Sequence, residues 1–273
     1  MKITLLSYNV FGSPFSGEKI IRSLLRTKVR NRFRHIAKGI VKEDLDILLF
    51  QEVHTYPHFY LLRRALKSYP YVMYQKGIYG PKGGLVIFSK LPLEKKRYVD
   101  FYDKGVWWNQ SIVGVLTQRG ILYGKIKNKN IWLLNTHLTQ NKKGNWDKTM
   151  TPRSILKSQL QQCINLVQRL HDKGASIICS GDFNMPHTIP LYREFIKATH
   201  LKDSFIDTPE DTYHILFKGL DSYGRIDYLF YSHSKNIKLE ERKYMFTEPL
   251  RTEKNEELLL SDHVALVASF SLL

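Results

Sequence analysis

The sequence predicts an α/β protein in which two β-sheets pack against each other and carry helices on their outer faces. Two observations lead to this fold class: short apolar segments of strand type recur along the chain, and the few amphipathic helices between them do not alternate strictly with the strands. Strict alternation would favour one parallel sheet, whereas runs of strands with a few inserted helices favour two packed sheets.

The predicted strands are short runs rich in Ile, Leu, Val, Phe and Tyr that are bounded by Gly, Pro, Asn or Asp. In chain order they are residues 2–10, 45–53, 83–89, 120–126, 131–138, 175–183, 225–232 and 263–272.

The first predicted helix lies between the first two strands, at residues 31–43, where apolar residues repeat at helical spacing. We expect its opposite face to be a solvated surface. That face carries the cations Arg32, Arg34, Lys38 and Lys42.

A second amphipathic helix is predicted at residues 152–171, with Pro152 in its first turn, and a third follows Pro190 and includes residues 194–197. No internal repeat, low-complexity tract or Ser/Gly-rich linker divides the chain. We therefore expect residues 1–273 to form one domain, and we expect it to be a monomer.

The charge balance is strongly basic, with 42 Lys and Arg against 25 Asp and Glu and a net charge of +17. Such a field attracts nucleic acid, anionic membrane surfaces and phosphorylated ligands. The two cysteines, Cys163 and Cys179, suit neither a disulfide framework nor a structural zinc site, so we expect reduced core residues. The first residues lack the pattern of a secretory signal, which favours a cytoplasmic protein, or a secreted one if a leader has been removed.

Polar residues gather at one end of nearly every predicted strand. Taken singly, an Asp or Asn after a strand is commonly a turn residue, and a lone His is more often structural than catalytic. Together, the carboxylates and amides favour a hard-oxygen site for Mg²⁺, with Mn²⁺ as an alternative, and the histidines supply acid–base chemistry. The set is Asn9, Glu52, His137, Asp182, Asn184, Asp227, Asp262 and His263.

The ordered segments "SYNVFG", "LLFQEV", "GGLVIFSK", "LLNTHL", "SGDFNM", "GRIDYLFYS" and "SDHVAL" resemble the endonuclease/exonuclease/phosphatase superfamily. This superfamily includes pancreatic-type deoxyribonuclease, abasic-site endonucleases, inositol polyphosphate 5-phosphatases and neutral sphingomyelinases. The resemblance implies a deoxyribonuclease-like fold, a four-layer α/β sandwich of two packed, mainly antiparallel sheets flanked by helices.

The resemblance also implies a role for each residue of the set. Asn9, Glu52 and Asp262 would hold or adjoin Mg²⁺. Asp182 would orient or activate the attacking water, Asn184 would donate to a phosphoryl oxygen, and His137 would stabilise the phosphate or protonate the leaving oxygen. His263 would be the general base or a phosphate ligand, and Asp227 would fix its tautomer.

The substrate remains open between phospholipid and nucleic acid. "RGILYGKI" and the helix after His137 resemble the neutral sphingomyelinase branch, and His137 itself argues against abasic-site repair. Trp107 and Trp108 could anchor at a membrane, stack on bases or simply plug the edge of the sandwich. The lysines of residues 137–154 fit either polyanion.

Two further alternatives are weaker. A phosphoinositide phosphatase would have an Arg soon after Asn184, where this chain has Met185, Pro186 and His187. An inert binding protein of the same fold would have lost site residues, and every motif keeps its central group. The sequence thus predicts a metal-dependent phosphodiesterase, with a sphingomyelinase-like lipid substrate slightly ahead of nucleic acid.

Overall fold

The computed structural model describes residues 1–12, 29–103, 118–140, 150–208, 210–213, 224–232, 234, 236–251, 255 and 257–272. Trp107, Trp108 and residues 141–149 of the predicted cleft loop at residues 137–154 lie outside the described residues.

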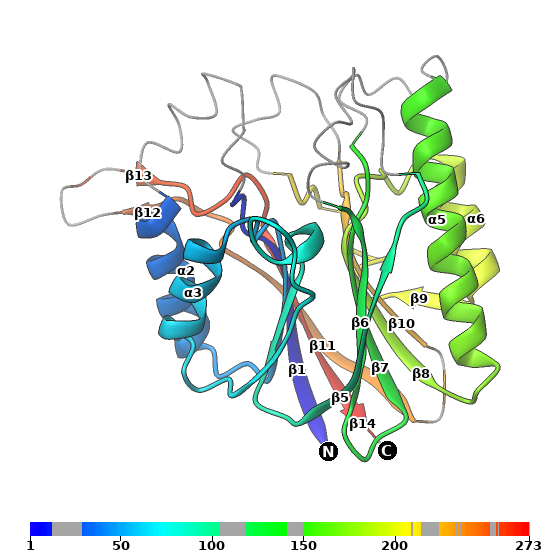
Figure 1. Ribbon diagram of the computed structural model, residues 1–273, viewed down its shortest axis with the longest axis horizontal. Helices are drawn as coiled ribbons and strands as arrows, with labels where there is room; N and C mark the ends of the chain where they lie inside the picture. Colours follow the sequence, from blue (N-terminus) through cyan, green and yellow to red (C-terminus); the bar gives the residue numbers. More distant parts are fainter. Residues whose placement is uncertain are drawn as a thin grey trace.

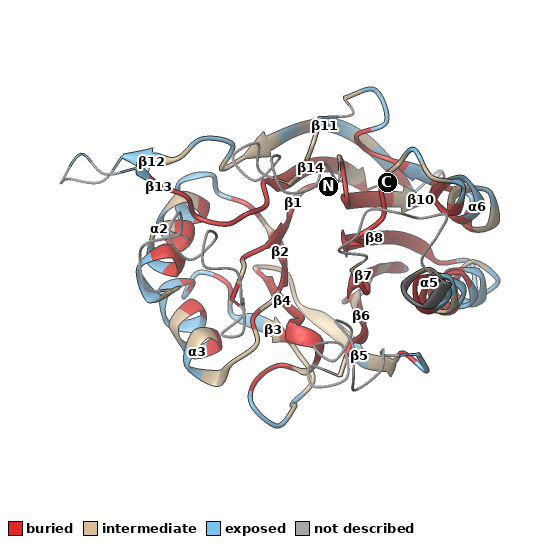
Figure 2. Ribbon diagram, turned by 90° about the horizontal axis from the view of Figure 1, so that it is seen from above, coloured by how far each residue is buried: buried red, intermediate tan, exposed pale blue. Residues whose placement is uncertain are grey.

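Two six-stranded sheets face each other, as Figures 1 and 2 show. The first sheet has the order β11 (Ile237–Met245), β14 (Ala265–Leu272), β1 (Lys2–Asn9), β2 (Ile47–Gln51), β4 (Val86–Ser89) and β3 (Tyr71–Met73). The second has the order β5 (Leu93–Asp100), β6 (Gly120–Ile126), β7 (Ile131–His137), β8 (Ser176–Asp182), β10 (Asp227–Ser232) and β9 (Leu201–Asp203). The short strands β12 (Leu250–Arg251) and β13 (Glu257–Leu258) pair separately.

Each large sheet contains one parallel pair, β1 with β2 and β7 with β8, and all its other pairs are antiparallel. Helices α2 (Val29–Lys42) and α3 (Tyr56–Ala65) cover the first sheet, and α5 (Met150–His171) and α6 (Pro190–Thr199) cover the second (Figure 1). The predicted four-layer α/β sandwich with mainly antiparallel sheets is therefore confirmed.

The period-two alternation of the strands divides the core into layers. On β1, Ile3 and Leu5 point between the two sheets, whereas Leu6 and Tyr8 point toward α2 and α3. Cys163 and Cys179 are free and buried between α5 and the second sheet, as predicted. Within the described residues, no helix is long and apolar enough to cross a membrane.

Sequence reasoning missed α3 and most of the strands at or near the sheet edges. Strand β5 reads LEKKRYVD and strand β11 reads IKLEERKYM, and both carry exposed charged residues because little of an edge strand is covered. Helix α3 begins after its N-cap residue Thr55, whose side chain accepts a hydrogen bond from His58 N.

The prediction of a solvated basic face on the first helix is wrong for Arg32. Its side chain is 2% exposed, and its guanidinium donates to the carbonyls of Val10, Phe11 and Leu260 at 3.2, 2.8 and 2.8 Å. Two of these carbonyls lie in the loop after β1 and the third lies in the loop before β14. All three need hydrogen-bond donors. Arg32 thus holds the loop that follows Asn9 against the loop that carries Asp262.

Candidate active site

The predicted polar residues converge at one edge of the sandwich, which is the upper edge in Figure 1, opposite the N-terminus. Asn9 ends β1, and Glu52 directly follows the parallel neighbour β2. His137 and Asp182 end the parallel strands β7 and β8 in register, and Asp227 stands opposite Asp182 at the start of β10.

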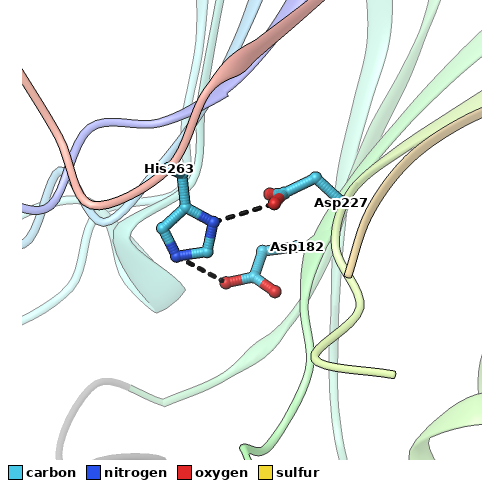
Figure 3. Close-up of side chains that lie close together, drawn as sticks. All are labelled: Asp182, Asp227 and His263. Atoms are coloured by element: carbon cyan, nitrogen blue, oxygen red, sulfur yellow. Dashed lines mark hydrogen bonds and ion pairs between the residues drawn. The ribbon is translucent and has the colours of Figure 1, made fainter. Parts of the chain in front are cut away.

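His263 lies between two carboxylates (Figure 3). Its Nδ1 is 2.8 Å from Asp227 Oδ2, and its Nε2 is 3.8 Å from Asp182 Oδ2. Burial opposes a charge on the imidazole, but Asp227, Asp262 and Asp182 together raise the pKa of His263 well above its ordinary value. The geometry therefore favours an imidazolium at neutral pH.

Asp182 is the hub of the cluster. Its Oδ2 accepts a hydrogen bond from Asn9 Nδ2 at 3.0 Å, and its Oδ1 accepts one from the backbone N–H of Asn184 at 2.9 Å. Burial, and next the charge of Asp227, raise the pKa of Asp182 to about 7, although His263 and the two hydrogen bonds favour the ionised form. Asp182 can therefore exchange a proton near neutral pH.

His137 lies on the other side of Asp182, with 3.3 Å between its Nε2 and Asp182 Oδ2. Burial and the neighbouring charge of Arg119 hold the pKa of His137 well below its ordinary value, so a neutral imidazole is favoured. The site thus contains two histidines with opposite protonation preferences, which is a typical arrangement for acid–base work.

The Asn184 side chain donates from Nδ2 to the carbonyl of Leu138 at 3.0 Å. Its backbone has a φ of +48°, a conformation that Asn tolerates better than most residues. One of the two amide hydrogens is used by this contact, so the other is available to a ligand.

Glu52 and Asp262 are the acidic residues on the side of the first sheet. Glu52 Oε2 is buried and has no hydrogen-bond partner among the described residues. Burial and the charge of Asp262 raise the pKa of Glu52, which is the situation that a bound cation would relieve. These two carboxylates therefore fit a divalent metal ion.

Asn9 fits a metal less directly. Its Nδ2 points at Asp182 Oδ2 and Glu52 Oε1, at 3.0 and 3.4 Å, and its Oδ1 already accepts a hydrogen bond from Phe11 N at 3.0 Å. A carbonyl oxygen has a second lone pair, which is the one a cation would use.

Sequence reasoning missed Arg119 as a site residue. Arg119 is 7% exposed, donates to the carbonyl of Leu138, and has a buried Nε without a partner in the described part of the chain. Its charge acts on Glu52 and Asp182. The available signal was an Arg-Gly pair placed immediately before a predicted strand.

His54 is the second missed residue. Its Nδ1 is buried and unpartnered among the described residues, and burial together with Arg119 lowers the pKa of His54 to about 3. It is therefore a neutral side chain close to the charged cluster.

Solved structures resemble this chain over almost its whole length. SmcL matches with a TM-score of 0.71 and 17% identity, covering 99% of each chain. Sphingomyelinase C from Streptomyces griseocarneus matches with a TM-score of 0.68 and 17% identity, covering 98% of this chain and 99% of its own. Truncated Caenorhabditis elegans TDP2 matches with a TM-score of 0.67 and 23% identity, covering 99% of this chain and 97% of its own. At these identities the likeness shows the fold.

A search of curated proteins finds no match. The Endonuclease/Exonuclease/phosphatase family, in contrast, matches residues 6–263, a span that includes every predicted site residue. The chain therefore belongs to the Endonuclease/Exonuclease/phosphatase family.

Proposed function

We propose that this protein is a Mg²⁺-dependent phosphodiesterase that cleaves the head group from a phospholipid by in-line attack of water. The observation that carries the proposal is the buried cluster of Asp182, Asp227 and His263, whose ligand atoms lie within 4.8 Å of one another beside Glu52 and Asp262. Such a set of carboxylates and imidazoles suits phosphoryl transfer, in which charge accumulates on oxygen.

The residues divide the work according to their protonation preferences. Asp182, with its pKa of about 7, would orient the attacking water and accept its proton. The charged His263, held by Asp227, would stabilise the phosphoryl oxygens, and the free amide hydrogen of Asn184 would donate to the same group. The neutral His137 would bind the phosphate or the leaving oxygen through a ring N–H hydrogen bond, and the leaving oxygen would take its proton from water.

Glu52 and Asp262, with Asn9, would hold the metal. Mg²⁺, when bound there, would supply positive charge to the phosphate, and Mn²⁺ has similar ligand preferences. Phosphodiester cleavage requires that these side chains be fixed in position before the substrate binds. The hydrogen bonds from Asn9 Nδ2 to Asp182 and Glu52 hold the two carboxylates in place.

The lipid substrate is supported by the likeness to SmcL and to sphingomyelinase C over nearly complete chains. Nucleic acid is the second candidate, and the observation in its favour is the net charge of +17. We propose a monomer that works in the cytoplasm or, with a leader, outside the cell, and Trp107 and Trp108 remain candidates for a membrane contact.

The test is release of phosphocholine from sphingomyelin in mixed micelles, with Mg²⁺, with Mn²⁺ or with chelator, alongside a plasmid-nicking assay. We expect metal-dependent phosphocholine release that falls little with added salt. No release, together with nicking that declines steeply with salt, would instead assign the protein to nucleic acid.

Replacing Arg119 with Met is expected to lower kcat/KM about tenfold to a hundredfold. The buried guanidinium interacts with Glu52 and Asp182, and its charge would stabilise the negative charge of a phosphate bound beside them. Hydrolysis of bis(p-nitrophenyl) phosphate measures the loss. Lys125→Met, on the same sheet but paired with Glu94, is the matched control and should keep full activity. Equal losses in both variants would show that Arg119 is structural.

A further inference from the structure

A tight turn at residues 77–80, here called the tip, exposes two large side chains. Ile78 is 74% exposed and Tyr79 is 70% exposed. The turn is closed by a hydrogen bond from Gly77 N to Gly80 O at 2.9 Å, and residues on either side of it form a β-bridge. Neither exposed side chain is needed for this closure, because it uses only backbone atoms.

The tip is fixed to the segment that follows Glu52. Tyr56 donates from its backbone N to Tyr79 O at 3.0 Å and from its hydroxyl to Gly77 O at 2.9 Å. Gly80 packs so closely on this segment that a Cβ there would lie 2.4 Å from His54 O. The tip is therefore a fixed projection on the rim of the candidate active site.

Helix α3 extends the exposed surface. Tyr60 is 55% exposed, and its ring stacks on that of Tyr56 with 6.1 Å between centroids and an interplanar angle of 28°. One turn further along the helix, Arg63 and Arg64 are exposed. Aromatic and basic side chains thus succeed one another along the helix that begins under the tip.

The segment that contains the tip and α3 carries only positive charge. Residues 53–93 contain six Lys and Arg and no Asp or Glu. Lys82 pairs with Asp100 and Lys90 pairs with Asp44. The other four cations of the segment are exposed and form no ion pair with any described residue; they are Arg63, Arg64, Lys67 and Lys76.

We propose that this surface, consisting of Ile78, Tyr79, Tyr60 and the four unpaired cations, docks the protein on a bilayer that contains anionic phospholipid. Exposed apolar groups enter the interface, tyrosine favours the head-group level, and clustered Lys and Arg are attracted to anionic lipids. The inference deepens the proposed function, because a docked tip would present the adjacent site to a lipid. Binding itself does not require hydrolysis.

The experiment measures co-sedimentation with vesicles of phosphatidylcholine alone or with phosphatidylserine, using the Asp182→Asn protein so that no lipid is consumed. Ile78→Ser with Tyr79→Ser should weaken binding to the mixed vesicles about tenfold or more, because the apolar contact is lost. Arg63→Gln with Arg64→Gln should weaken binding to mixed vesicles about tenfold and leave binding to phosphatidylcholine alone unchanged.

Matched controls come from the other side of the molecule. Ile206→Ser removes an isoleucine that is 55% exposed, and Arg193→Gln with Lys197→Gln removes two exposed cations from α6. Both controls should bind as the parent does. The proposal would be overturned if the tip variants bound vesicles as tightly as the parent does, or if the controls lost as much binding as the tip variants. It would also be overturned if Tyr60 and Tyr79 were needed to bind single-stranded DNA and the protein did not bind vesicles.

Soluble bis(p-nitrophenyl) phosphate separates this inference from the proposed function. In the otherwise wild-type protein, the tip variants should hydrolyse it at the normal rate. The cluster of Asp182, Asp227 and His263 is held by contacts among its own described residues, in which Ile78 and Tyr79 take no part. Tip-dependent vesicle binding without any hydrolysis would refute the phosphodiesterase and leave the docking surface standing. Metal-dependent hydrolysis together with vesicle binding that does not depend on the tip would refute the docking surface and leave the phosphodiesterase standing.

Discussion

Asp182→Asn is expected to lower the rate of phosphodiester hydrolysis by about a thousandfold, because the amide cannot accept the proton of the attacking water. Asn keeps the shape of the side chain and its carbonyl can still accept the backbone hydrogen bond from Asn184. The measurement is kcat for bis(p-nitrophenyl) phosphate and for sphingomyelin micelles at saturating Mg²⁺. Asp172→Asn, an exposed change beyond α5, is the control.

At pH 8, Asp182→Asn should not lower the melting temperature of the metal-free protein. The folded-state pKa of Asp182 is raised from 3.8 to about 7, so its stabilising effect is complete below pH 4 and is lost as the pH rises to about 7. At pH 8 the buried carboxylate is a net cost, and Asp182→Asn should melt at the same or a higher temperature than wild type. A lower melting temperature, or a loss of activity no greater than in Asp172→Asn, would contradict the assigned role.

The site could be predicted from the sequence because its residues are tied to strand ends. Strands β7 and β8 pair in parallel with His137 opposite Asp182, so the last residues of the two strands stand side by side. Asp227 joins them because β10 pairs with β8 from its first residue. The sequence placed these residues at the ends of predicted strands, and the structure shows which strands pair and in which register.

Arg32, Arg119 and the tip could not be predicted in this way. Arg32 is buried because distant carbonyls require its guanidinium, although helical spacing alone places it on the basic face. Arg119 lies at the site because it is the last residue of the loop before β6. The spacing of apolar residues, which predicts helices and strands, does not predict where a loop residue lies. The tip depends on hydrogen bonds between Tyr56 and a turn about twenty residues later, as its contact with Gly77 shows.

Asp227→Asn is expected to lower kcat/KM about a hundredfold at neutral pH and to move one limb of the pH–rate profile to lower pH. Burial opposes a charge on His263, and the Asp227 carboxylate, 2.8 Å from Nδ1, is the main group that raises the His263 pKa. Without that carboxylate the pKa of His263 falls, because burial then opposes the charge with less compensation. His263 then loses its proton at a lower pH than in wild type.

Which limb moves identifies the working form of His263. If the imidazolium stabilises the phosphoryl oxygens, activity is lost when His263 deprotonates, so the alkaline limb shifts to lower pH. If a neutral imidazole acts as the base, the acid limb shifts to lower pH instead. The raised pKa in the structure favours the first result. A uniform decrease across all pH values would refute the coupling, and Asp207→Asn, which removes a surface partner of Arg242, should leave both limbs in place.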